Sequence, residues 1–173
     1  TLPGAEEAGL PIALPPVRVL AGLYVNELLM RLLRRLDPQP ELFAAYQTLL
    51  AELAQAAGEE PPLRRFEKRL LDELGYGLNL EHEAGSGQPI VAETQYCYVL
   101  DQGPQVADGT AAGIPISGHS LLALRDGVLT DPAILREVKR LTRAALAEQL
   151  RGRVLKTREL YRVRRQPPAE SPP

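Results

Sequence analysis

Residues 63–78 read LRRFEKRLLDELGYGL, and their apolar positions follow the period of an α-helix. The apolar side chains recur at offsets of three and four, at Leu63, Phe66, Leu70, Leu71 and Leu74. Proline at 61 and 62 suits the first turn of a helix, where no amide donor is needed, and glycine at 75 and 77 suits its end. The stretch therefore predicts a helix that buries one face in a core.

The other face of this helix is predicted to be basic, because it carries Arg64, Arg65, Lys68 and Arg69. Two pairs of these cations are four residues apart, and like charges at that spacing cost about a few tenths of a kcal/mol per pair. Neighbouring acidic residues relieve part of this repulsion. Two interpretations stay open, which are a basic face that simply meets water and a basic face kept for an acidic partner.

The composition is that of a globular domain of 173 residues, with 45% hydrophobic and 24% charged residues. The single cysteine, Cys97, cannot form a disulfide within the chain, which fits a reducing cytoplasm. The most apolar run, 17–36, is interrupted by Asn26, Glu27, Arg31, Arg34 and Arg35, so it predicts a buried helix and not a membrane span. We expect Asn26 and Glu27 to make structural hydrogen bonds, because buried polar groups need partners.

Charge is unevenly distributed along the chain. Residues 136–165 hold eleven basic and three acidic residues, a local charge of +8, whereas the whole chain has a net charge of −2. The remainder therefore carries −10. Such an asymmetry predicts a basic surface for an acidic polymer.

The sequence predicts a mainly α fold, a helical bundle with a small inserted β-hairpin subdomain. Helices are expected over 17–36, 41–57, 63–78, 118–125, 131–151 and 155–165. Residues 79–116 are rich in glycine and proline and are expected to form the insertion, with a strand at 93–100 and shorter strands near 105–107 and 113–116. Residues 1–16 are predicted to be a linker, 17–165 the folded domain, and 166–173 a disordered tail.

We find no pattern typical of an active site, so the sequence predicts a protein that is not an enzyme and needs no cofactor. The only histidines are His82 and His119, and Ser120 beside His119 does not by itself make a nucleophile–base pair. The two histidines and Cys97 lack the paired spacing of a zinc site, so no metal is expected. Binding through the basic helices near the C-terminus remains, and clustered cations there suit phosphate contacts.

Six blocks occur in order and at suitable spacing to resemble the RecO family of bacterial recombination and repair mediators. They are GLYVNELLMRLL (22–33), DPQPELFAAY (37–46), LRRFEKRLLDELGYGL (63–78), PISGHSLLAL (115–124), VKRLTRAAL (138–146) and GRVLKTREL (152–160). The resemblance covers about residues 17–165. It implies the helical body of such a protein without its N-terminal OB-fold domain, with 1–16 as the junction.

The resemblance also implies a function in DNA repair and homologous recombination. Members of this family bind single- and double-stranded DNA, anneal complementary strands, and act with RecR to help load RecA, with RecA an indirect partner. They also bind the acidic C-terminal tail of the single-stranded DNA-binding protein, which ends in phenylalanine. A cytoplasmic, nucleoid-associated location without a membrane partner follows from this likeness.

The same resemblance suggests where these partners bind. We expect Arg64, Arg65 and Phe66 to bind the tail, because a terminal carboxylate and an aromatic ring need a cation beside an apolar pocket. The expected DNA-binding residues lie in the two C-terminal helices and the turn between them: Arg136, Lys139, Arg140, Arg143, Arg153, Lys156, Arg158 and Arg162. Many family members carry a zinc site of two cysteine pairs in the insertion, but Glu83 and Ser86 stand near the first pair's positions, so we expect no zinc.

An alternative remains open at this point. The chain could be a protein-interaction domain that binds acidic peptide tails through its basic faces without binding DNA itself. DNA binding with and without the segment after residue 136 would distinguish the two functions.

Overall fold

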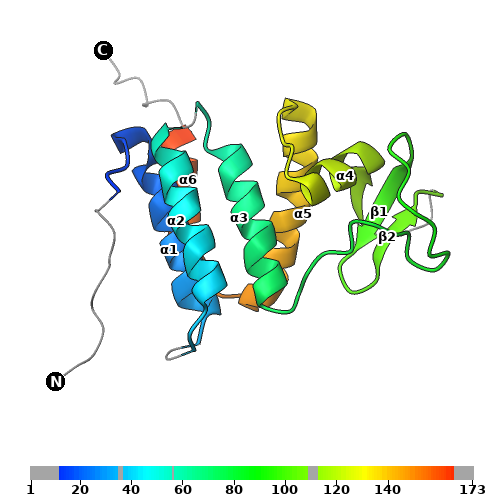
Figure 1. Cartoon of the computed structure of the whole chain (residues 1–173), viewed down its shortest axis with the longest axis horizontal. Helices are drawn as coiled ribbons and strands as arrows, with labels where there is room; N and C mark the ends of the chain where they lie inside the picture. The colour runs from blue at the N-terminus through cyan, green and yellow to red at the C-terminus, as the bar shows by residue number, and fades with distance from the viewer. Residues whose placement is uncertain (1–11, 35–36, 56, 109–112, 166–173) are drawn as a thin grey trace, which may run out of the picture.

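A computed structural model describes residues 12–34, 37–55, 57–108 and 113–165. In this part of the chain the fold is mainly α, as predicted, with a small sheet at one end (Figure 1). The helices are the 3-10 helix η1 (Pro16–Arg18) and α1 (Val19–Leu32), α2 (Pro40–Gln55), α3 (Glu60–Glu73), α4 (Gly118–Asp126), α5 (Pro132–Leu150) and α6 (Lys156–Arg165). The strands are β1 (Gln95–Val99), β2 (Gly103–Val106) and β3 (Ile114–Ser117).

Helix α3 lies inside the bundle, packed between α2 and α5 (Figure 1). Its apolar face is buried as the sequence predicted, at Leu63, Phe66, Leu70 and Leu71. The helix begins at Glu60, so both prolines fall in its first turn, and it ends before Gly75, whose φ of 80° suits a residue without Cβ. These local signals explain why this prediction was confirmed.

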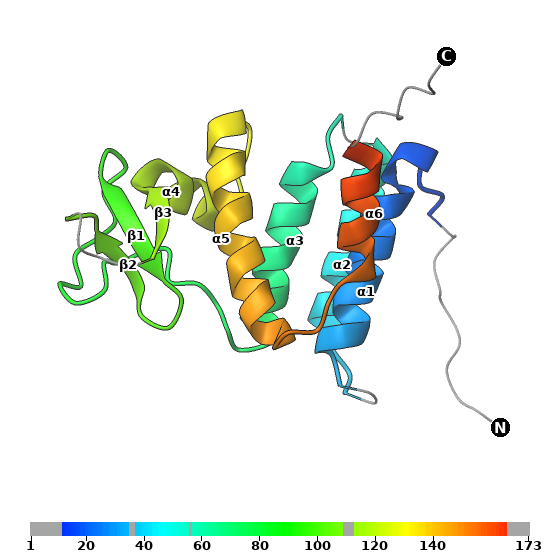
Figure 2. The same ribbon diagram turned by 180° about the vertical axis from the view of Figure 1, so that it is seen from behind.

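Helix α1 is less enclosed than the sequence suggested. Its inner face is buried at Tyr24, Val25 and Leu28, but Leu23 is half exposed and Met30 is 77% exposed. The reason is position, because α1 lies at the edge of the bundle beside α6 and α2 (Figure 2). The prediction of a buried helix therefore holds for its inner face and not for its outer face.

The three strands form an antiparallel sheet in the order β2-β1-β3. Cys97 in the central strand lies opposite Gln105 on one side and Pro115 on the other. Tyr96 and Tyr98 are two residues apart and therefore share the buried face of the sheet. The predicted hairpin and the third strand are both confirmed, and this sheet covers a second hydrophobic core under α4 and α5.

Helix α5 belongs to both hydrophobic cores. Asp131 caps its N-terminus by accepting a hydrogen bond from the Ala133 N–H, and Pro132 is the first residue of the helix. Val138 and Leu141 in its first half pack in the core beneath the sheet, while Leu146 and Leu150 in its second half pack in the bundle core. The helix therefore joins the bundle to the insertion.

The ends of the chain lie mostly outside the described residues, including 1–11 of the predicted linker and the predicted tail 166–173. Residues 12–15 adopt no regular structure, but Leu14 packs against the bundle core. A Cβ added to Gly22 would lie 2.7 Å from the Leu14 side chain. This part of the predicted linker therefore packs closely against α1.

Candidate functional site

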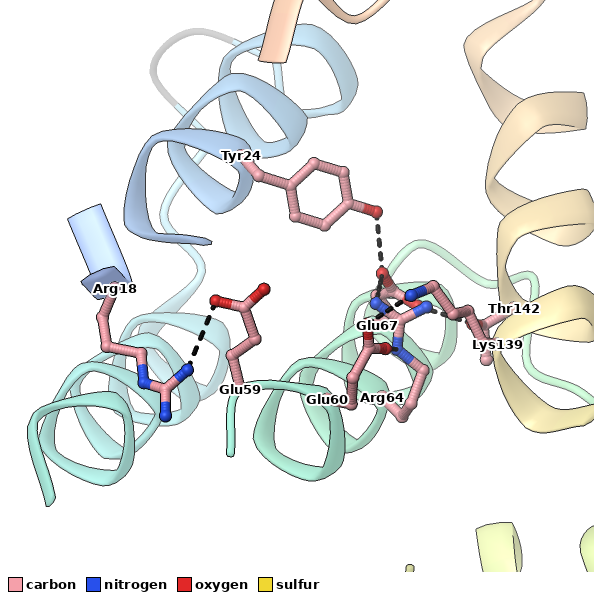
Figure 3. Close-up of polar contacts among 8 residues, drawn as sticks. All are labelled: Arg18, Tyr24, Glu59, Glu60, Arg64, Glu67, Lys139 and Thr142. Atoms are coloured by element: carbon pink, nitrogen blue, oxygen red, sulfur yellow. Dashed lines mark hydrogen bonds and ion pairs between the residues drawn. The ribbon is translucent and has the colours of Figure 1, made fainter. Parts of the chain in front are cut away.

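A cavity of about 390 Å³ opens between α1, α3, α5 and α6. Its lining contains Tyr24, Glu59, Glu60, Leu63, Arg64, Lys139, Arg143, Arg158, Tyr161 and Arg162. Five of these side chains are basic and two are acidic, so the cavity has an excess of positive charge. Figure 3 shows how several of these groups from different helices converge.

Arg64 is the most deeply placed cation of this cavity, with only 1% of its surface exposed. Its Nη2 lies 2.9 Å from Glu67 Oε1, and its Nε lies 3.8 Å from Glu60 Oε2. Among the described residues no acceptor forms a hydrogen bond with Nε or Nη1, although both atoms are buried. Of the two interpretations left open for the basic face, a solvated face does not describe Arg64, because the side chain turns inward to pair with Glu67.

Glu67 is itself fully buried and is the centre of a network that joins three helices (Figure 3). It accepts hydrogen bonds from Tyr24 Oη at 2.7 Å and from Thr142 Oγ1 at 2.6 Å. Burial and the neighbouring Glu67 carboxylate raise the pKa of Tyr24, so the tyrosine stays a protonated donor. The network holds the Arg64 guanidinium in one position at the back of the cavity.

The remaining cations of α3 are paired, which removes most of the expected self-repulsion. Lys68 Nζ lies 2.9 Å from Asp72 Oδ2, and Arg69 Nη2 lies 2.6 Å from Glu73 Oε1. These side chains lie outside the cavity lining. The helix therefore does not keep four unpaired cations for an acidic partner, and the cavity-facing cation is Arg64.

Helix α5 contributes Lys139 and Arg143 to the wall opposite α3. Lys139 Nζ donates a hydrogen bond to Glu60 Oε1. Burial lowers the pKa of Lys139 against the opposing effect of Glu60, and burial together with the Arg64 charge lowers the pKa of Arg143. Both shifts express the cost of gathering cations in a partly desolvated space, which a bound anion would relieve.

Helix α6 completes the cavity with Arg158, Tyr161 and Arg162. The Nε and Nη2 atoms of Arg158 are buried and form no hydrogen bond with any described residue. Tyr161 contacts Tyr24 edge to face, with ring centroids 6.5 Å apart and planes at 85°. Leu63 and the two tyrosines therefore offer an apolar surface beside the arginines, an arrangement that can hold a carboxylate or phosphate next to a ring.

The structure brings together residues that the sequence assigned to two separate sites. Arg64, from the expected tail site, shares the cavity with four expected DNA contacts, namely Lys139, Arg143, Arg158 and Arg162. Arg65 points elsewhere, since its Nη2 lies 3.0 Å from Glu52 Oε2 in α2. Phe66 is only 3% exposed and packs in the bundle core. Neither Arg65 nor Phe66 lines the cavity.

The other four expected DNA contacts lie outside the cavity. Arg136 and Lys156 are exposed, Arg140 donates to the Pro115 carbonyl at 2.6 Å, and Arg153 donates to the Arg31 carbonyl at 2.6 Å. Arg153 also lines a smaller cavity of about 230 Å³, which shares Arg158 and Arg162 with the larger one. The basic residues thus continue from α5 across the turn to both sides of α6.

Sequence reasoning missed Tyr24, Glu60 and Tyr161 as members of the site. The spacing of Glu60, Arg64 and Glu67 on one helix face was a signal that the arginine has acidic partners. No local pattern connects Tyr24 in α1 with Tyr161 in α6, because their contact depends on how the two helices pack.

The described residues contain neither a membrane-spanning helix nor a cluster of metal ligands. No helix there has the length and apolar character needed to cross a bilayer. No group of three or more histidine, cysteine, aspartate or glutamate side chains lies close enough there to hold a metal ion.

Residues 15–159 match the family described as "Recombination protein O C terminal". The chain is 46% identical over 158 residues to "DNA repair protein RecO" of Methylococcus capsulatus, which covers 91% of this chain and 64% of that protein. It is 45% identical to the protein of that name from Nitrosococcus oceani, in a match that covers 92% of this chain and 65% of the relative. It is 41% identical to the one from Pseudomonas aeruginosa, in a match that covers 98% of this chain and 72% of the relative.

The matched region contains all of α1 to α5 and the walls of the cavity from α1, α3 and α5. This chain spans slightly less than two thirds of the length of the Methylococcus and Nitrosococcus proteins. The match extends over most of the chain and includes the bundle and the inserted sheet. On these grounds the chain belongs to the RecO family, in the part described as the C-terminal region of recombination protein O.

Proposed function

We propose that this chain acts in DNA repair and homologous recombination as the helical part of a recombination mediator. In this proposal it binds single- and double-stranded DNA and the C-terminal tail of single-stranded DNA-binding protein, and it works in the cytoplasm, associated with the nucleoid. With RecR it promotes strand annealing and the loading of RecA, and it catalyses no reaction itself. Support comes from family membership, from relatives named DNA repair proteins, and from the cationic cavity.

The observation that carries the tail-binding part is the buried guanidinium of Arg64 in the cavity lining, whose Nε and Nη1 donate no hydrogen bond to any described residue. A buried polar group without a hydrogen-bond partner destabilises the protein. An anion that accepts hydrogen bonds from these donors would remove that penalty, which favours its binding. A peptide ending in phenylalanine supplies both a terminal carboxylate and a ring. The carboxylate suits Arg64 and Arg158, and the ring suits Leu63, Tyr24 and Tyr161.

Fluorescence anisotropy with a labelled acidic peptide that ends in phenylalanine tests this assignment. Arg64→Ala should weaken binding by about tenfold or more, in line with loss of a charge-assisted hydrogen bond. Arg65→Ala, one residue away and paired with Glu52 outside the cavity, is the matched control and should bind as the wild type does. Arg162→Ala at the exposed rim should also weaken binding, and it does not disturb the Glu67 network.

Two peptide variants sharpen the result. An amidated C-terminus removes the carboxylate, and replacement of the last phenylalanine by alanine removes the ring. Both should bind more weakly to the wild type, whereas Arg64→Ala should respond less to amidation because the carboxylate no longer has its partner. Equal affinity for Arg64→Ala and the wild type, with both folded by circular dichroism, would reject the assignment.

The DNA-binding part rests on the basic residues that continue from α5 through the turn to α6. Phosphate contacts release counterions, so the affinity for an oligonucleotide should fall steeply as salt is added. Replacing both Arg153 and Lys156 by alanine should lower the salt slope by roughly one for each phosphate that is no longer bound. Lys68→Ala, a cation on α3 paired with Asp72, is the control. Binding that does not depend on salt would contradict phosphate binding here.

A second function is favoured by one specific observation. Four of the eight expected DNA contacts line a cavity of about 390 Å³ between helices, whose size suits a side chain and a carboxylate better than a duplex. The chain would then be a protein-interaction domain that binds acidic peptide tails and does not bind DNA itself. Tight peptide binding without oligonucleotide binding at low salt would select this function.

A further inference from the structure

Helix α6 forms one wall of the cavity and packs chiefly against α1. It carries Arg158, Tyr161 and Arg162 into the cavity lining. Its outer residues Leu160 and Val163 are 51% and 67% exposed, and its packing is chiefly against α1 (Figure 2). The position of this helix therefore depends chiefly on its interactions with α1.

The N-terminus of α6 lacks a capping side chain of its own. The first amide groups of a helix have no partner within it and need an acceptor. The residue before α6 is Leu155, whose side chain has no acceptor and is buried in the bundle core. A cap must therefore come from elsewhere in the fold.

Glu27 of α1 supplies this cap from a distant part of the sequence. Its Oε1 accepts from the Lys156 N–H at 2.8 Å, and its Oε2 accepts from the Thr157 N–H at 2.9 Å and the Thr157 hydroxyl at 2.7 Å. The Glu27 side chain is almost fully buried. A carboxylate at this end of a helix also interacts favourably with the helix dipole.

The carboxylate is charged in this position. Burial by itself would raise the pKa of Glu27, but the hydrogen bonds from Thr157 and Lys156 and the charge of Arg31 outweigh that effect and hold the pKa below its ordinary value. Arg31 Nη2 lies 3.9 Å from Glu27 Oε1. At neutral pH the cap is therefore fully formed.

A second residue of α1, Tyr24, connects α6 to the cavity. Tyr24 lies three residues before Glu27, contacts Tyr161 of α6 edge to face, and donates to Glu67 beside Arg64. Glu27 does not line the cavity, so it has no direct contact with a ligand there. We propose that Glu27 is a positioning residue that sets the α6 wall of the cavity and thereby the affinity for an anionic ligand.

The ligand part of this inference rests on the proposed function, so the experiment measures two quantities. Hydrogen exchange reports the amides of α6 and α3 without any ligand, and fluorescence anisotropy reports binding of an acidic peptide ending in phenylalanine. Glu27→Ala and Glu27→Gln are compared with Glu159→Ala, which removes an exposed acid from α6 itself.

The control separates positioning from charge. Removing an acidic residue near a cationic cavity should by charge alone leave anion binding equal or tighter. Positioning predicts the opposite sign for Glu27 variants. In Glu27→Ala the α6 amides should exchange about tenfold faster, as expected for loss of a helix cap, while α3 amides are unchanged, and peptide affinity should fall about fivefold or more. Glu27→Gln, which keeps the shape, should show smaller changes in the same direction.

Two results would overturn the inference. One is unchanged exchange in α6 of Glu27→Ala, which would mean that the cap does not hold the helix. The other is faster exchange in α6 with peptide affinity equal to or tighter than that of the wild type. If the α3 amides of Glu27→Ala also exchange faster, the milder variant Glu27→Gln is compared with the wild type in the same two measurements. Failure of the wild type itself to bind the peptide would count against the proposed function, while the exchange result would still decide whether Glu27 holds α6.

Discussion

Arg64 and Glu67 lie one turn apart on α3 and form a buried ion pair, with Arg64 Nη2 2.9 Å from Glu67 Oε1. Tyr24 and Thr142 also donate hydrogen bonds to the Glu67 carboxylate, so its negative charge is well compensated. The Arg64 guanidinium is less well compensated, because its Nε and Nη1 form no hydrogen bond with a described residue. The pair therefore couples the stability of the bundle to the electrostatics of the cavity.

Glu67→Gln should destabilise the protein markedly. Removing one partner of a buried ion pair leaves an uncompensated buried charge, which costs about 3–5 kcal/mol. Urea denaturation followed by circular dichroism gives the free energy of unfolding. The control is Glu73→Gln, whose partner Arg69 is partly exposed, and this change should cost less than about 1 kcal/mol. Equal losses of stability for the two variants would mean that burial of the pair does not matter.

Leu70→Ala should lower the free energy of unfolding by about 2–5 kcal/mol, because Leu70 is fully buried in the bundle core and its truncation leaves a cavity. Leu160→Ala on the outer face of α6 makes the same chemical change at a half-exposed position. That variant should lie within about 0.5 kcal/mol of the wild type. A small effect at Leu70 would show that the bundle collapses around the missing side chain.

Gly118→Ala should destabilise the junction of β3 and α4. A Cβ at this position would lie 1.9 Å from the Val91 carbonyl oxygen, so the backbone must move, at a cost of about 1–3 kcal/mol or more. Gly58→Ala is the matched control, because a Cβ there has no neighbour within 4 Å. Thermal unfolding of the two variants provides the test, and a wild-type midpoint for Gly118→Ala would refute the close approach.

Acidic pH should weaken the packing of α5 against the β3–α4 junction through Glu137. Glu137 Oε2 accepts from the Ser117 N–H at 2.9 Å and from the Ser117 and Ser120 hydroxyls at 2.7 Å each. Burial raises the pKa of Glu137, but these hydrogen bonds and Arg140 outweigh burial and hold the pKa below its ordinary value. A lowered pKa in the folded state means that the stabilisation is complete above the unfolded pKa of about 4.3 and is lost as pH falls through the folded pKa.

Comparison of the wild type with Glu137→Gln by urea denaturation from pH 7 to pH 3 measures this effect. The wild type should be more stable at pH 7, and the difference should shrink below about pH 4 as the carboxyl group is protonated. Glu148→Gln, an exposed acid on the same helix, controls for general charge effects. A difference that is constant over this range would exclude the proposed titration.

The helices and strands could be predicted because their signals are local. Asp131 before Pro132 and Ser117 before Gly118 act as N-caps, and Gly75 follows α3, so each signal lies within one turn of the helix end that it sets. The strand around Tyr96 and Tyr98 was likewise evident from its content of tyrosine, threonine and valine. Periodicity, strand composition and caps therefore sufficed for the mainly α fold with an inserted sheet.

The site could be predicted only in part, because its geometry depends on contacts between distant segments. The basic residues of α5 and α6 were recognised by composition, yet the inward turn of Arg64 depends on Glu67, Tyr24 and Thr142 meeting from three helices. The cap of α6 by Glu27 bridges 129 residues of sequence. Sequence predicted that Glu27 makes a structural hydrogen bond, but packing alone selected its partner.

The passage of α5 through both hydrophobic cores bears on how this protein can be divided. Residues 79–116 look like a detachable module in the sequence, yet Leu80, Tyr96 and Ile116 cover Val138 and Leu141 of α5. Excision of the insertion would remove the packing partners of the first half of α5 and expose its apolar side chains to water. Shortened versions of this domain therefore need polar replacements on the first half of α5 to remain in solution.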